Sequence, residues 1–291
     1  MVTIPSGGQA PCIGAALKHM TGEGVFRKVG HGRVAEEAVR QVETLVLEGV
    51  LRPGDRLPAE RDLARILDIS RPTLRQALAE LEERGLLEAR QGGGTYVAQV
   101  MRSIFAEPII GLFASHPRAT GDYLEFRAEV EAIAARLAAE RATTADKAIL
   151  SRVIEAMHTA HELDDPAEEA RLDVEFHIAI VDAAHNIVLI QTLRSIYNLL
   201  VHGVFYNRTM LYRLPGGRDR LMRQHEAIHA AIMAGDGAAA SSAVHAHLDY
   251  VRQAMHDAES LGAREATALR RLQKFEQTDT TPGTARRRQT P

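Results

Sequence analysis

The 291-residue chain has little cysteine and few aromatic residues, and these scarcities exclude several classes of protein. Cys12 is the sole cysteine, which excludes both an internal disulfide framework and a zinc cluster built from cysteines. Tryptophan is absent and aromatic residues make up 4% of the sequence, whereas alanine is abundant. This balance favours packed helices over strands.

Long apolar runs are also missing. No run approaches the roughly 18 residues that a membrane-spanning helix needs, and residues 1–30 hold no apolar core of the length found in secretory signals. The sequence is nevertheless 45% hydrophobic and 25% charged, so the chain is able to bury real cores. We expect a cytoplasmic protein of two domains that has no membrane partner.

The net charge of −3 lacks the strong basic excess that would by itself indicate nucleic acid as a partner. Apolar periodicity and helix breakers divide the chain into five expected segments. These are a disordered leader (1–30), a small helix-and-hairpin domain (31–100), a linker (101–121), an antiparallel all-α bundle (122–260) and a basic flexible tail (261–291).

The first domain has the element order of a winged helix-turn-helix. Helical periodicity starts at Val34, a short helix covers 59–67, and a third helix over 71–84 ends before Gly85. Two strand-like runs then flank a glycine cluster and predict a β-hairpin. In this fold one helix braces the DNA backbone, the next enters the major groove, and the hairpin reaches the flanking groove or phosphates.

Basic and short polar side chains gather on the elements that would face DNA. Arg71 and Arg75 are four residues apart and share one helix face, and the glycine-rich hairpin tip lets the backbone approach a phosphate closely. The alternative interpretation is an ordinary solvated surface. The candidate DNA contacts are Arg61, Ser70, Arg71, Thr73, Arg75, Gln91 and Gly92.

The chain has 13 histidines, and some of them fall on inward helix faces. The helix expected over 166–184 is apolar nearly all round and is therefore buried, yet it carries Asp173 and His177 on consecutive turns. A buried carboxylate is costly unless it is paired or bound to a metal. The two side chains could satisfy each other, which is the plainer alternative.

Two further helices add histidines. His225 lies inside the apolar stripe of the helix over 218–234 and His229 lies at its edge. On the last bundle helix, His247 and His245 occupy opposite shoulders of the inner face, and periodicity prefers His247 only weakly. One Asp and three His from three helices form a suitable ligand set for Zn²⁺ or a similar divalent ion.

The stretch LRPGDRLPAERDLARILDISRPTLRQALAELEERGLLEARQGGGTYV resembles the DNA-binding domain of GntR-family transcription regulators. The motifs LEFRAEVE, LDVEFHIAI, AAHNIVL, QHEAIHAAI and HAHL resemble the FCD ligand-binding domain of the FadR subfamily. The similarity covers roughly residues 33–258. Within the subfamily, DYLEFRAEVE and AAHNIVLIQTLRSIYNLL are most similar to regulators that sense lactate, glycolate or pyruvate.

The resemblance implies a specific ligand set and an effector contact. It selects His225 and His247 over their neighbours, so that the implied metal ligands are Asp173, His177, His225 and His247. Zinc is the expected ion, with nickel or manganese as alternatives. Arg127 occupies the place of an inward arginine that would bind the effector carboxylate, and its alternative role is a structural salt bridge to Glu131.

These features together predict a metabolite-responsive transcription regulator that is not an enzyme. A homodimer would bind double-stranded operator DNA, and a small 2-hydroxy or 2-oxo carboxylate at the metal site would modulate that binding. Two alternatives remain open at this point. One is a constitutive DNA-binding regulator with a purely structural metal, and the other is a metal-dependent hydrolase.

Overall fold

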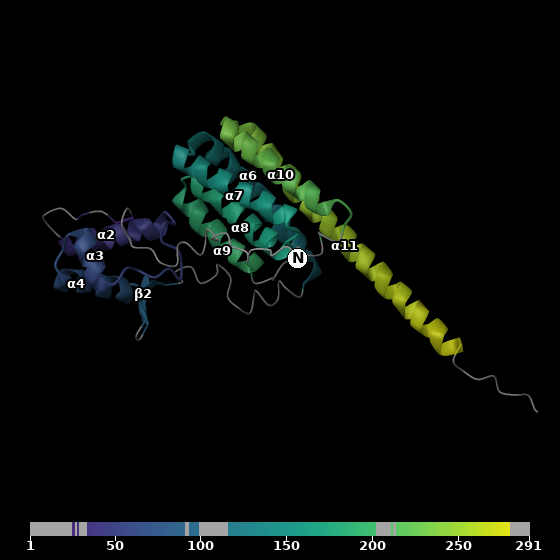
Figure 1. Ribbon diagram of the computed structural model, residues 1–291, viewed down its shortest axis with the longest axis horizontal. Coiled ribbons are helices and arrows are strands. Elements are labelled where there is room, and N and C mark those ends of the chain that lie inside the picture. The colour runs from purple at the N-terminus through teal and green to yellow at the C-terminus, as the bar shows by residue number, and fades with distance from the viewer. Residues whose placement is uncertain are drawn as a thin grey trace, which may run out of the picture.

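The computed structural model describes residues 25, 26, 28, 34–90, 93–98, 116–201, 211 and 214–279. They form a small N-terminal domain and a C-terminal helical bundle (Figure 1). The N-terminal elements are α2 (Val34–Leu47), α3 (Glu60–Leu67), α4 (Arg71–Glu83), β1 (Leu87–Arg90) and β2 (Gly94–Val97).

The N-terminal domain is the predicted winged helix-turn-helix. Asp68, the residue that follows α3, has a φ of 61° and turns the chain. Ser70 caps α4 by accepting a hydrogen bond from the Thr73 amide at 3.3 Å. Strands β1 and β2 pair antiparallel, in register from Leu87 opposite Val97. The helices and strands of this domain share one buried core, which includes Val39, Val42, Leu63, Leu67, Leu74, Leu81, Leu87 and Val97.

Part of the expected disordered leader belongs to this domain. Phe26 is 4% exposed and packs in the N-terminal core, and Lys28 Nζ lies 3.2 Å from Asp68 Oδ2. The prediction of disorder through residue 30 was therefore wrong at these positions. The isolated aromatic side chain gave no periodic signal, although its burial removes a large apolar surface from water.

Six helices of the described chain form the bundle, and the fold class is confirmed as mainly α. They are α6 (Pro117–Arg141), α7 (Thr144–Glu162), α8 (Pro166–Ala183), α9 (Ile187–Val201), α10 (Gly217–Ala234) and α11 (Gly237–Asp279). Figure 1 shows α6, α7, α8 and α10 running alongside one another, and α11 packs against α6 and α10. Fully buried residues of the bundle core include Leu150, Phe176, Leu193, Ile228 and Leu248.

Two predicted boundaries of the bundle were wrong. Helix α6 begins at Pro117, so the end of the expected linker is helical, because proline is well tolerated in a first helical turn. Helix α11 continues to Asp279, well into the expected flexible tail, and projects past the bundle in Figure 1. Residues 263–279 contain strong helix formers and no proline, which explains the continuation.

None of the helices in the part of the chain that the structure describes combines the length and the apolar character needed to cross a bilayer.

Candidate metal centre

Three helices bring four side chains of metal-ligating types to one point inside the bundle. Helix α8 supplies Asp173 and His177, α10 supplies His225, and α11 supplies His247. All four residues are between 0% and 3% exposed, and one ligand atom from each lies within 4.8 Å of the others. The bundle therefore concentrates one carboxylate and three imidazoles in its buried interior.

The carboxylate of Asp173 lies between two of the rings. Its Oδ1 is 3.0 Å from His225 Nε2, and its Oδ2 is 3.7 Å from His177 Nε2. The ring of His247 completes the group, with its centroid 4.6 Å from that of His225 and 5.3 Å from that of His177. One carboxylate oxygen and three ring nitrogens are therefore close enough together to share a single ion.

Two polar side chains orient these rings from outside the group. His177 Nδ1 lies 2.8 Å from Glu131 Oε2, and His247 Nδ1 lies 3.1 Å from Gln224 Oε1. When Nδ1 donates to such a partner, the lone pair of Nε2 remains available as a ligand. His177 Nε2 is buried and makes no hydrogen bond with any described residue.

A buried imidazole nitrogen without a hydrogen bond is costly, and a divalent cation would satisfy it. The N₃O donor set also suits Zn²⁺ and other borderline divalent ions. The four residues therefore fit a metal site. His229 and His245 stay outside the group: both are half-buried, and His229 Nε2 lies 3.2 Å from Ser151 Oγ.

Arg127 is fully buried beside the group and forms an ion pair with Glu131. Its guanidinium carbon lies 5.3 Å from the Tyr197 ring centroid and 5.8 Å from that of Tyr123. Burial by itself raises the pKa of Glu131, but Arg127 and His177 outweigh it and lower that pKa to about 2. The carboxylate thus stays ionised and links the arginine to the metal group.

Sequence reasoning identified Glu131 only as a partner of Arg127 on the same helix. Its contact with His177 crosses from α6 to α8, and Gln224 reaches His247 from α10 to α11. Helical periodicity shows which face of one helix is buried, but it does not show which residue of another helix packs there. It therefore could not predict either contact.

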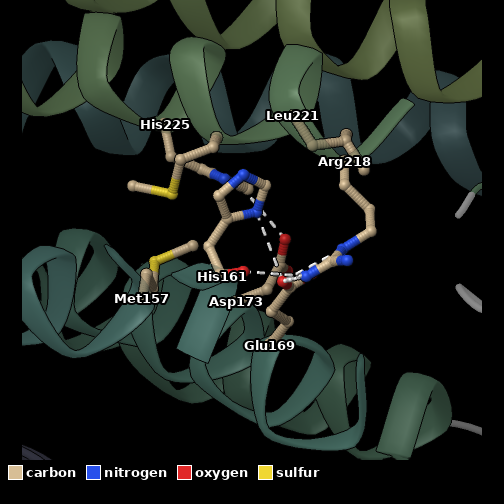
Figure 2. A pocket seen from close by; sticks show the side chains of 8 residues that line it. Met157, His161, Glu169, Asp173, Arg218, Leu221 and His225 are labelled. Atoms are coloured by element: carbon tan, nitrogen blue, oxygen red, sulfur yellow. Dashed lines mark hydrogen bonds and ion pairs between the residues drawn. The ribbon is translucent and has the colours of Figure 1, made fainter. Parts of the chain in front are cut away.

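A pocket reaches the group from one side. Figure 2 shows Asp173 and His225 in its lining together with His161, Glu169 and Arg218. Arg218 Nε donates to Glu169 Oε1 at 3.1 Å, and its other nitrogens donate to the His161 carbonyl and to Asp164. The Arg218 guanidinium and the Glu169 carboxylate therefore line the approach to the buried histidines.

The N-terminal candidates occupy a different environment. Arg61, Ser70, Arg71 and Arg75 are exposed, whereas Thr73 is half-buried. Arg75 Nε donates to Glu60 Oε2 at 2.8 Å, so one cation of the α4 face is already paired. Gln91 and Gly92, the hairpin-tip candidates, lie outside the described residues.

Comparison with known proteins identifies the family. Residues 34–97 match the bacterial regulatory proteins of the gntR family, and residues 122–250 match the FCD domain. The chain belongs to the GntR family. It is a DNA-binding transcription regulator with an FCD domain and not an enzyme, which removes the hydrolase alternative.

Several relatives resemble this GntR regulator over most of its length. An Escherichia coli protein named as a regulatory protein of the L-lactate dehydrogenase operon is 38% identical, covering 82% of this chain and 92% of its own. The Glc operon transcriptional activator of E. coli is 37% identical, covering 79% and 91%. A solved GntR structure from Streptococcus agalactiae is 29% identical, with a TM-score of 0.47 and coverage of 75% and 99%.

Proposed function

We propose that the protein is a homodimeric regulator whose affinity for operator DNA changes when a small 2-hydroxy or 2-oxo carboxylate binds in the bundle. The observation that carries this proposal is the buried group of Asp173, His177, His225 and His247 with a buried arginine beside it. A GntR DNA-binding domain attached to such a site suits a sensor.

The four residues would hold a divalent metal ion, with zinc the expected one and nickel or manganese as alternatives. Asp173 contributes about one negative charge and the neutral imidazoles contribute none, so the loaded site keeps an excess of positive charge. A bound ion would supply open coordination positions that accept carboxylate and hydroxyl oxygens. Glu131 and Gln224 would keep His177 and His247 in the ligating orientation.

Arg127 would recognise the carboxylate of the effector. Its guanidinium is already held in place by Glu131 and lies near two tyrosine rings. An incoming carboxylate would compete with Glu131 for this cation through a charge-assisted pair. The exchange would alter the contacts between α6 and α8, because Glu131 also faces His177.

The chemistry of the site favours one class of acid. Lactate, glycolate and pyruvate each carry a second oxygen next to the carboxylate, whereas acetate does not, so acetate has fewer donors to offer. One relative supports the same class, since its name refers to an L-lactate dehydrogenase operon.

DNA recognition is assigned to α3, α4 and the hairpin. Arg71 and Arg75 in the N-terminal half of α4 would reach base edges in the major groove. The other predicted contacts, Arg61, Ser70, Thr73, Gln91 and Gly92, would position the domain on the backbone. A two-fold dimer would match a pseudo-palindromic operator.

The almost complete burial of the four candidate ligands also favours a second candidate function, in which no effector reaches the metal. In that case the metal would be structural, and operator binding would be constitutive. A thermal-shift panel of small carboxylates, run with and without a chelator, separates the two.

We expect lactate, glycolate or pyruvate to raise the Tm of the metal-loaded protein and acetate to raise it much less. The chelator is expected to abolish the shift in the wild type. The control variant His229→Ala is expected to respond as the wild type does. The effector proposal fails if no small hydroxy or oxo acid raises the Tm, or if the shift survives removal of the metal.

A further inference from the structure

The C-terminal end of α2, in the DNA-binding domain, is capped by side chains of the bundle. The last carbonyls of a helix lack partners within the helix itself. Gln191 Nε2 donates to the Val46 carbonyl at 2.9 Å and to the Leu47 carbonyl at 2.8 Å. Arg194 Nη1 donates to the Gly49 carbonyl at 3.0 Å. Both donors come from α9, more than 140 residues further along the chain.

Arg194 is itself held rigidly by the bundle. Its Nη2 donates to both carboxylate oxygens of Asp182, at 2.8 and 2.6 Å, and its side chain is 12% exposed. Arg52 of the DNA-binding domain lies 3.6 Å from the same carboxylate. Asp182 therefore joins an arginine from each domain, and a half-buried charge-assisted pair of this kind has a defined geometry.

The backbone at Gly49 is shaped for this contact. Its φ is +73°, which glycine adopts without strain. A Cβ added at Gly49 would lie 2.5 Å from Arg194 Cζ. The guanidinium thus occupies the space that any other residue at position 49 would need for its side chain.

We propose that Gln191 and Arg194 are positioning residues that cap α2 from the other domain and thereby fix the orientation of the DNA-binding domain on the bundle. Asp182 lies on α8, nine residues beyond Asp173 and five beyond His177. At 1.5 Å per residue these separations are about 14 Å and 8 Å along one rigid helix. A displacement of α8 at the metal group would therefore reach the cap directly.

The proposal goes beyond the proposed function, because the cap needs neither metal nor effector to orient the domain. Its test is an interdomain distance distribution from electron-spin labels. Labels are attached in a Cys12→Ser background at Glu83→Cys on α4 and Arg152→Cys on α7, both exposed positions. Labelled chains are diluted with unlabelled chains, so that only distances within one chain are measured.

We expect one narrow distance peak in the parent protein and its loss in the Gln191→Ala/Arg194→Ala variant. Gln191→Ala alone should broaden the peak, and it leaves the pair between Arg194 and Asp182 intact, so it keeps the test valid if the double variant folds poorly. Arg141→Ala is the matched control. Arg141 donates to the Ala184 carbonyl at 3.2 Å, which is the same chemistry within the bundle alone.

Gly49→Ala provides an independent arm of the same test. It should broaden the peak more in the parent protein than in the Arg194→Ala background, where the clash is absent and only the strain of a left-handed alanine remains. Metal content should stay at the parent level in every variant. An unchanged peak in Gln191→Ala and in a folded double variant would overturn the proposal, as would equal broadening in Arg141→Ala.

Discussion

The two domains place their candidate functional residues in opposite environments. Arg71 and Arg75 of the DNA-binding domain are exposed, whereas Asp173 and its three histidine neighbours are buried. Exposed arginines are common on the surfaces of helices, so the presence of one does not by itself predict a DNA contact. A buried carboxylate with histidines at helical spacing requires partners, so that pattern indicates a site.

The same contrast governs the energetics of ion pairs. Arg75 and Glu60 form an exposed pair whose contribution to stability is small. Arg127 and Glu131 are buried, so removing Arg127 takes the cation away from a buried carboxylate that then faces His177. Substitutions of the exposed arginines on the DNA-binding face should therefore change DNA binding and leave stability intact, whereas substitutions around Asp173 and its three histidine neighbours should change both.

The largest expected effect is that of Arg127→Met. It removes the cation from a buried pair and should lower the free energy of unfolding by about 3–5 kcal/mol. Chemical denaturation measures the change. Arg136→Met is the control, because Arg136 pairs with Glu140 on the exposed surface of the same helix. Adding Glu131→Gln to Arg127→Met should restore part of the loss, and equal losses in Arg127→Met and Arg136→Met would refute the contrast.

The metal-centre histidines come next. His177→Ala, His225→Ala and His247→Ala should each lower metal content and reduce stability by about 2–4 kcal/mol, because each removes a ligand and opens a cavity. Elemental analysis and thermal unfolding give the two quantities. His229→Ala and His245→Ala are matched controls on α10 and α11 and should retain the metal. Full metal content in all three ligand variants would refute the proposed metal site.

On the DNA-binding side, Arg71→Ala and Arg75→Ala should each weaken specific operator binding by about 1–3 kcal/mol. Their thermal stability should stay close to that of the parent protein. Arg84→Ala, at the far end of α4, serves as the control for a lost surface charge. Parent-level operator affinity in both variants would show that α4 is not the reading helix.

The smallest effect distinguishes two functions of one residue. Ser70 caps α4, so Ser70→Ala should lower stability by about 1 kcal/mol. Thr143 caps α7 through a capping box, and Thr143→Ala should have a similar effect on thermal unfolding. If Ser70 also contacts DNA, Ser70→Ala weakens operator binding while Thr143→Ala does not. If the Ser70→Ala and Thr143→Ala variants bind the operator equally well, Ser70 acts only as the helix cap.

Local signals in the sequence predicted much of this architecture. The helix expected over 71–84 agrees with α4 at Arg71–Glu83, and the apolar stripe of α10 placed His225 inward. Periodicity alone preferred His247 to His245 only weakly, and the family resemblance made that choice. The buried position of His247 agrees with it.

Contacts between distant elements could not be predicted in the same way. The pairing of Glu131 with His177 depends on how α6 packs against α8, and the cap that Arg194 provides depends on how two domains meet. Phe26 joins a core through an isolated side chain. The extension of α11 was missed because a charged, polar composition indicated a tail, whereas the intrinsic helix propensity of its residues prevailed.

The most direct test of the central claim is the fluorescence anisotropy of labelled operator DNA, titrated with lactate, glycolate, pyruvate and acetate on metal-loaded protein. The account predicts that at least one of the first three changes operator affinity, that acetate acts weakly, and that chelation removes the response. Equal potency of acetate and lactate would contradict the account, as would operator affinity that no small hydroxy or oxo acid alters.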